Sequence, residues 1–127
     1  MTWPRLLLDT HVFLWWRAND PRLGAEGRRA IAEAGEVVVS AASAWEVAIK
    51  VTLGKLELPG PFEGGVDDSG FGKLPVTFAH AERVKALPHH HRDPFDRMLV
   101  AQALEEGLLL VTHDRQFDPY RVPTLRV

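Results

Sequence analysis

The sequence predicts an α/β fold of three layers, in which a mainly parallel central sheet lies between two layers of helices. Short apolar segments of strand length alternate with longer segments that have helical spacing and helix-capping residues. The expected strands are continuous apolar runs, which is typical of parallel strands that are buried on both faces. With 127 residues, 46% of them hydrophobic, the chain is expected to form one domain over residues 1–127.

The first half of the chain is expected to hold two strands and three helices. The strands are continuous apolar runs over residues 6–8 and 37–39. The first helix covers residues 12–16 and ends at the break at 19–21, and the second covers 24–34, with Gly35 as its C-cap. Ser43 is expected to open the third helix, which runs to about Leu53, because residues 43–46 form a capping-box pattern.

The second half begins with an irregular segment over residues 54–75, which is rich in glycine and is expected to be a loop with one weak helical turn. Residues 74–76 are expected to form a short strand, and residues 78–87 a helix that Pro88 ends. Asp93 and Pro94 are an N-cap and a first helical residue, so a helix is expected from there to Glu106. Strands are expected over 108–112 and 123–127.

Charge and composition limit the function classes. The chain has no cysteine and a net charge of -2, and it contains no apolar stretch of membrane-spanning length. The start of the chain does not resemble a signal peptide, so a cytoplasmic protein is expected. Because proteins that bind nucleic acid through its phosphates are usually basic, a nucleic-acid role here requires a local basic patch or bound cations.

Four acidic residues are expected at one edge of the sheet. Ligands of open α/β sheets bind outside the carboxyl ends of the strands. Asp9 directly follows the first strand, and Asp114 lies two residues past the strand over 108–112. Glu46 is on the first turn of the helix after the second strand. Asp96 is on the first turn of a helix that must start near the same edge if its crossover is right-handed.

Carboxylates that converge in this way repel one another at neutral pH, which favours bound divalent cations. Mg²⁺ or Mn²⁺ suits oxygen ligands, and such an ion can activate a water and stabilise charge on a phosphodiester. We therefore expect Asp9, Glu46, Asp96 and Asp114 to be catalytic, with Asp9, Asp96 and Asp114 as metal ligands. Asp93 is a candidate for supporting the site.

Each acid also has a local alternative. Asp9 could cap the helix that follows it, and Asp96 could favour the dipole of its own helix. Glu46 could complete the capping box or pair with Lys50 one turn later. Asp114 could be a turn residue.

Other polar and aromatic residues have weaker patterns. The histidines at 89–91 suggest a transition-metal site, but adjacent histidines cannot easily all face one ion, so a solvated loop is expected. Trp15 and Trp16 are expected in the core or at a dimer interface, and Trp45 in the core. Arg97 and Arg115 flank the acids and, with Arg92, are candidates for holding the phosphate backbone of a nucleic acid. Lys50 could contact phosphate or only neutralise Glu46.

Four segments together resemble the PIN-domain family, and within it the VapC-type toxins of toxin–antitoxin pairs. They are LLLDTH at 6–11, SAWEVAIK at 43–50, DPFDRMLVAQA at 93–103 and LVTHD at 110–114. The resemblance covers nearly the whole chain, in order and with suitable spacing. The chain departs from the family at residues 62–72, where glycines replace an expected helix, which affects antitoxin contact or dimer geometry rather than the chemistry.

The resemblance implies a Mg²⁺- or Mn²⁺-dependent endoribonuclease with a parallel sheet, a cognate antitoxin protein, an RNA substrate and a homodimer. Asp9, Glu46, Asp96 and Asp114 match the family's acidic residues. Thr10 and Thr112 match hydroxyl positions beside the first and last acids, where they could hold waters or orient carboxylates. The alternative function is a non-catalytic or solitary PIN-like module that binds RNA or metal without an antitoxin.

Two unrelated classes of α/β protein with an aspartate after a strand fit less well. A phosphatase of the haloacid-dehalogenase type needs a second aspartate two residues after the first, where this chain has His11. A receiver domain needs an aspartate after a middle strand and a lysine after a later one. Ser40 follows the strand over 37–39, and no lysine follows the strand over 108–112.

Overall fold

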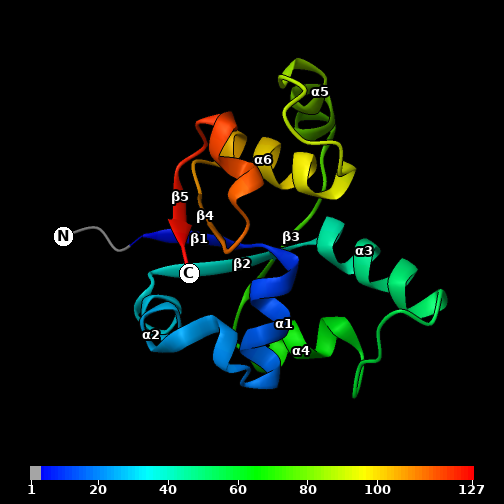
Figure 1. The fold of residues 1–127 in the computed structure, drawn as a ribbon, viewed down its shortest axis with the longest axis vertical. Helices are drawn as coiled ribbons and strands as arrows, with labels where there is room; N and C mark the ends of the chain where they lie inside the picture. Colours follow the sequence, from blue (N-terminus) through cyan, green and yellow to red (C-terminus); the bar gives the residue numbers. More distant parts are fainter. Residues whose placement is uncertain (1–3) are drawn as a thin grey trace.

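A single parallel sheet forms the centre of the molecule in the computed structural model, which describes residues 4–127 (Figure 1). Within these residues the sheet has five strands in the order β3-β2-β1-β4-β5, and every neighbouring pair is parallel. The predicted parallel α/β architecture is confirmed. The strands are β1 (Arg5–Leu8), β2 (Glu36–Ser40), β3 (Gly72–Leu74), β4 (Leu109–Thr112) and β5 (Thr124–Arg126).

Helices cover both faces of the sheet (Figure 1). Helices α5 and α6 lie on one face, and α1, α2 and α4 lie on the other. The helices are α1 (Thr10–Ala18), α2 (Gly24–Glu33), α3 (Ala41–Thr52), α4 (Phe62–Asp68), α5 (Phe78–Ala86) and α6 (Pro94–Glu106), with short 3-10 helices η1 (Pro21–Leu23) and η2 (Arg115–Tyr120).

The side chains of β1 alternate between two separate apolar clusters, which accounts for the layered packing. Leu7 packs with residues of α6 and η2, such as Leu99 and Phe117. Leu6 and Leu8 face the opposite way and pack with residues of α1 and α2. Because successive strand residues point to opposite faces, an uninterrupted apolar run is what a strand between two helical layers requires.

The strand order creates a switch point between β1 and β4, which are neighbours in the sheet. The chain moves from β1 to β2 and β3 on one side, and then crosses by way of α5 and α6 to β4 on the other side of β1. Helices α1, α2 and α4, which come before the crossover, and helices α5 and α6, which form it, cover opposite faces of the sheet (Figure 1). Ligands of open α/β sheets bind in the crevice at the carboxyl ends of such a strand pair.

Several predicted boundaries were wrong, and each has a local cause. Helix α3 begins after Ser40, whose hydroxyl accepts the hydrogen bond of the Ala42 backbone N–H, so Ser43 and Glu46 do not form the expected capping box. Helix α2 ends at an extended Ala34 and not at a glycine cap on Gly35.

The glycine-rich segment between α3 and α5 is more ordered than the sequence suggested. It contains α4, where a loop with one weak turn was expected, so the departure from the family at residues 62–72 does not remove the helix. Strand β3 lies two residues earlier than predicted and ends at Leu74, before Pro75. A proline lacks the N–H that a paired strand residue donates, so its position limits the strand.

Gly107 ends α6 in the left-handed conformation, with φ of 68°. Gly107→Ala is expected to lower the free energy of unfolding by about 1 kcal/mol, because a Cβ is strained at this φ even where space is open. Gly64→Ala, inside α4 and with room for a Cβ, is the matched control and is expected to leave stability unchanged or raise it by up to about 1 kcal/mol. Urea denaturation measures both. Equal losses in the two variants would contradict the role of the backbone conformation.

Over the described residues 4–127, no helix combines the length and the apolar character needed to cross a bilayer. The expectation that the chain lacks a signal peptide depends in part on residues 1–3, which lie outside the described range.

Candidate active site

Two of the predicted acids meet at the carboxyl ends of β1 and β4. Asp9 caps α1, and its Oδ1 accepts the hydrogen bond of the Val12 backbone N–H at 3.0 Å. Its Oδ2 accepts a hydrogen bond from the hydroxyl of Thr112, the last residue of β4. The oxygen of this hydroxyl accepts the backbone N–H of Asp114 at 3.0 Å. Thr112 therefore joins Asp9 to the turn that carries Asp114, and its hydroxyl orients a carboxylate.

Asp9 has little contact with solvent, and its side chain lies in an environment that disfavours negative charge. Burial raises the pKa of Asp9 above its ordinary value of 3.8, and the charge of Asp114 adds to this effect. The hydrogen bonds from Thr112 and Val12 act in the opposite direction but are outweighed. A neighbouring cation would favour the ionised form of this carboxyl group.

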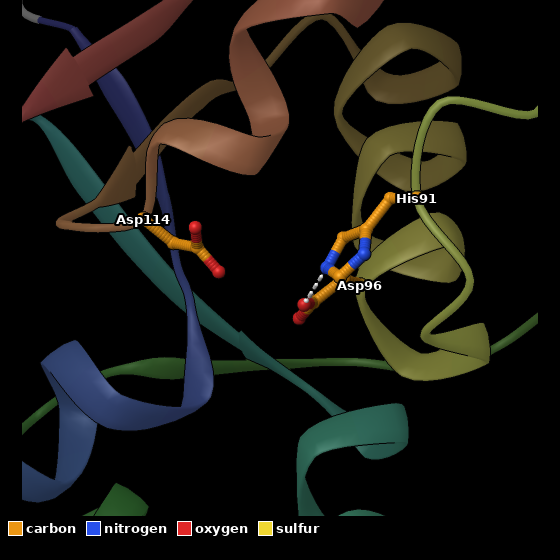
Figure 2. Close-up of side chains that lie close together, drawn as sticks. All are labelled: His91, Asp96 and Asp114. Atoms are coloured by element: carbon orange, nitrogen blue, oxygen red, sulfur yellow. Dashed lines mark hydrogen bonds and ion pairs between the residues drawn. The ribbon is translucent and has the colours of Figure 1, made fainter.

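Asp96 approaches the same place from the first turn of α6. Asp93 caps this helix, since its Oδ1 accepts the backbone N–H groups of Phe95 and Asp96 at 2.8 and 3.2 Å. The Oδ2 atom of Asp96 lies 2.7 Å from Nε2 of His91 (Figure 2). Burial, followed by the charge of Asp93, raises the pKa of Asp96 to about 7, and the charge of Asp9 contributes as well. His91 lowers this pKa in part.

Three possible metal-ligating atoms come together at this edge of the sheet. One ring nitrogen of His91 and one oxygen each of Asp96 and Asp114 lie within 4.8 Å of one another. In Figure 2 the Asp114 carboxylate faces the pair formed by His91 and Asp96. Carboxylate oxygens are the ligands that Mg²⁺ and Mn²⁺ prefer. Burial and then neighbouring carboxylates raise the pKa values of Asp9 and Asp96, and a bound cation would oppose this effect. The donor set therefore fits a divalent cation.

Glu46 lies on the second turn of α3, and both of its oxygens have protein partners. Oε1 accepts from the hydroxyl of Thr10 at 2.7 Å, and Oε2 accepts from Lys50 Nζ at 2.9 Å. Thr10 Oγ1 also lies 2.8 Å from Ser43 Oγ. Because a carboxylate only accepts, Thr10 donates its one proton to Glu46 and accepts from Ser43. Lys50 neutralises Glu46, which was one of the two roles considered for this lysine. Thr10 directly follows Asp9, so its hydrogen bond holds Glu46 near the first acid.

Arg97 does not lie where the sequence analysis placed it. Its side chain is only 8% exposed, and its guanidinium donates to the carbonyls of Val84, Leu87 and Pro88 and to the Tyr120 hydroxyl, over 2.7 to 3.3 Å. Carbonyls at the end of a helix lack internal partners and attract cations. Arg97 therefore joins the end of α5 to α6 and η2, and the expectation that it contacts RNA was wrong.

Arg115 has no observation for or against its expected phosphate contact, which stays a prediction. It is exposed at the first residue of η2, directly after Asp114. Asp114 caps η2, since its Oδ1 accepts the backbone N–H of Gln116 at 2.9 Å. Asp114 is therefore both a capping residue in a turn and an acid at the edge of the sheet, and the two roles do not exclude each other.

The aromatic predictions had mixed outcomes. Trp15 and Trp16 are partly buried and pack against the core on the α1 side of the sheet. Trp45 is 65% exposed, so its expected place in the core was wrong, and its ring instead packs edge-on against Phe95 at 5.3 Å between centroids. The buried residues of α3 are Ala42, Ser43, Glu46 and Val47, and Trp45 is not among them.

His91 lies at this site, although all three histidines at 89–91 were expected in a solvated loop and not at a metal site. His89 and His90 are exposed, as expected for a solvated loop, but the His91 side chain is only 10% exposed. The sequence did offer one signal for the position of His91. His91 lies two residues before the N-cap Asp93, which places it beside the first turn of α6 and therefore near Asp96. His89, His90 and His91 are adjacent in the sequence, but only His91 is turned towards the acids.

The raised pKa values predict how the stability of the metal-free protein depends on pH. The folded protein binds more protons than the unfolded chain between the ordinary pKa of 3.8 and the folded pKa of about 7 of Asp96. This stabilising contribution is complete below the unfolded pKa and is lost as pH rises through about 7, and Asp9 acts in the same direction. In chelator, the melting temperature is expected to fall from about pH 5 to about pH 8. Asp96→Asn should flatten this decline, and equal slopes in both proteins would contradict it.

Comparisons with known proteins agree with this architecture. A model of the PIN domain family matches residues 6–122. Ribonuclease VapC22 of Mycobacterium tuberculosis is 34% identical over 121 residues, which is 93% of each chain.

Two solved structures show the same fold at low sequence identity. VapBC2 from Rickettsia felis, bound to a DNA fragment from its promoter, gives a TM-score of 0.71 at 12% identity and covers 95% of this chain and 97% of its own. DNA-bound VapBC from Salmonella typhimurium gives a TM-score of 0.66 at 20% identity, with 97% and 96% covered. The family match spans most of the sequence and includes all four acids, so the chain belongs to the PIN-domain family.

Proposed function

We propose that this chain is a divalent-cation-dependent endoribonuclease that acts as the toxin of a toxin–antitoxin pair. The observation that carries the proposal is the approach of Asp96 and Asp114 at the carboxyl ends of the strands, beside Asp9, which Thr112 joins to the turn of Asp114 and whose charge acts on Asp96. The similarity to ribonuclease VapC22 supports RNA as the substrate, and the VapBC complexes among the similar structures support an antitoxin as the partner.

The proposed cation is Mg²⁺ or Mn²⁺, and Asp9, Asp96 and Asp114 would hold it. When bound, such a cation supplies a nucleophilic water at neutral pH and offsets charge on the scissile phosphodiester. Thr112 holds Asp9 towards the site, and Asp93 fixes the helix start that presents Asp96.

Glu46 is proposed as the fourth catalytic acid, which holds the attacking water in place. Thr10 and Lys50 fix its carboxylate from both sides, so it keeps one orientation. Arg115 is proposed to contact the RNA backbone next to Asp114. The bound cation and this arginine would supply the positive potential that a chain of net charge -2 lacks.

The remaining partners follow from the same proposal. A cognate antitoxin would bind this chain, and a second copy of the chain would form a homodimer. The chain would act as one nuclease domain in the cytoplasm, where its RNA substrate is found.

Expression and cleavage assays test this proposal together. Expression of the chain is expected to arrest growth, and co-expression of a small protein encoded next to its gene is expected to relieve the arrest. The purified protein should cleave RNA with Mg²⁺ or Mn²⁺ and stop when chelator is added. An inactive protein in both metals would favour the non-catalytic alternative. Cleavage without any neighbouring antitoxin gene would favour a solitary nuclease.

A further inference from the structure

We propose that His91 is a nitrogen ligand of the divalent cation, so that the site contains an imidazole in addition to carboxylates. This inference rests on the proposed function in that it takes Asp96 and Asp114 as cation ligands. It adds a residue from the loop between α5 and α6, which the acidic pattern of the sequence does not include.

The first support is the position of the ring nitrogen among the carboxylates. The candidate ligand atoms of His91, Asp96 and Asp114 all lie within 4.8 Å of one another. Two ligands on opposite sides of a cation, each bound at about 2.1 Å, are about 4.2 Å apart. Small side-chain movements would therefore bring all three atoms to one ion. Figure 2 shows Asp114 on the opposite side of this space from His91 and Asp96.

The second support is the direct contact between the ring and Asp96. Nε2 of His91 and Oδ2 of Asp96 are 2.7 Å apart, which is a hydrogen-bond distance and requires one proton between them. A divalent cation can take the place of this proton, because both atoms then present lone pairs to the ion. The contact in the metal-free protein thus orients the two groups as two neighbouring ligands would be oriented.

The third support is that the fold fixes the imidazole. The backbone N–H of His91 donates to the Tyr120 hydroxyl at 2.9 Å, and its ring packs edge-on against Phe117 at 6.2 Å between centroids. Both partners belong to η2, the short helix that Asp114 caps. One element therefore positions His91 and Asp114 together. A histidine of a solvated loop, such as the exposed His89, has no comparable support in the described structure.

An imidazole ligand changes which cation the site prefers. Mg²⁺ binds almost entirely through oxygen, whereas Mn²⁺ binds nitrogen ligands more readily. We therefore expect the ratio of Mn²⁺ to Mg²⁺ affinity to fall about tenfold when the imidazole is removed. Loss of a residue that only orients Asp96 would weaken both ions to a similar extent.

His91→Gln separates the two roles, because a glutamine amide can still donate a hydrogen bond to Asp96 but offers no imidazole nitrogen. Calorimetric titration of the untagged full chain with Mn²⁺ and with Mg²⁺ gives the affinity ratio. Pulsed EPR of the Mn²⁺-loaded protein detects a coordinated imidazole through its nitrogen nuclear coupling. His89→Ala, in the same loop, is the matched control, and circular dichroism with thermal melting checks that both variants are folded.

Imidazole coupling in the wild type and in His89→Ala, but not in His91→Gln, together with the lower affinity ratio, would support the inference. Mn²⁺ bound without imidazole coupling in the wild type would overturn it and leave the proposed nuclease intact. An unchanged affinity ratio in His91→Gln would also overturn it. A wild-type chain that binds neither ion would contradict both this inference and the metal dependence of the proposed function.

Discussion

Replacing Asp96 with asparagine is expected to lower metal-dependent RNA cleavage by at least about 100-fold while the protein remains as stable as the wild type, or becomes more stable. Asparagine has nearly the same shape but no charge, so it weakens the binding of a divalent cation. Asp96 is buried next to Asp93, which raises its pKa to about 7. Removing a charge that the fold disfavours should therefore not destabilise the metal-free protein near pH 8.

The opposite directions of the two effects make this prediction specific. Replacing a residue that only supports the fold would lower the stability and the activity of the protein together. Replacing a residue that is kept for its chemistry lowers the activity alone. Cleavage rates at saturating Mn²⁺ and urea denaturation without metal measure the two quantities. Asp68→Asn is the matched control, since it removes the same charge from an exposed position on α4, and it should retain cleavage within about twofold. Full cleavage activity in Asp96→Asn would show that the proposed site is wrong.

The second large effect is expected at Arg97, where Arg97→Met should lower the free energy of unfolding by about 3 kcal/mol. Methionine keeps much of the volume of the side chain but donates no hydrogen bond. The carbonyls of Leu87 and Pro88 would lose their donor, and each buried group left unpaired costs about 1 kcal/mol or more. The Tyr120 hydroxyl would lose one of its two donors. Because Tyr120 also holds His91, the change would loosen the loop before Asp96.

Urea denaturation with a matched arginine variant tests this role. Arg92→Met changes the same residue type at an exposed position five residues earlier, and it should alter stability by no more than about 0.5 kcal/mol. If Arg97→Met destabilised the chain as little as Arg92→Met, the buried hydrogen bonds of Arg97 would not be holding α5 in place.

The parts of the fold that the sequence predicted best are those set by local patterns. The apolar runs that became β1, β2 and β4 are buried on both faces, so their composition alone indicates strands in a parallel sheet. Asp93 and Gly107 sit at the ends of α6, where capping geometry favours these residue types. The places of Asp9 and Asp114 followed from the same reasoning, since Asp9 directly follows β1 and Asp114 lies two residues past the end of β4.

The parts of the fold that were mispredicted depend either on a choice between two similar local signals or on contacts with elements that are distant in the sequence. Ser40 and Ser43 are both good N-caps, and the end of β2 at Ser40 decides between them, which moves Trp45 to an exposed face. The burial of Arg97 depends on the carbonyls of α5, which are near in space but come from a different helix. His91 acquires its partners from η2, an element that the sequence did not predict.

The most direct measurement of the central claim is an anomalous difference map from a crystal of this protein soaked in Mn²⁺. The proposed site predicts a strong peak within bonding distance of the Asp9, Asp96 and Asp114 carboxylates, at the carboxyl ends of β1 and β4. If no peak appeared at this edge at a Mn²⁺ concentration that supports RNA cleavage in solution, the acids would not form the metal site, and the account would be contradicted.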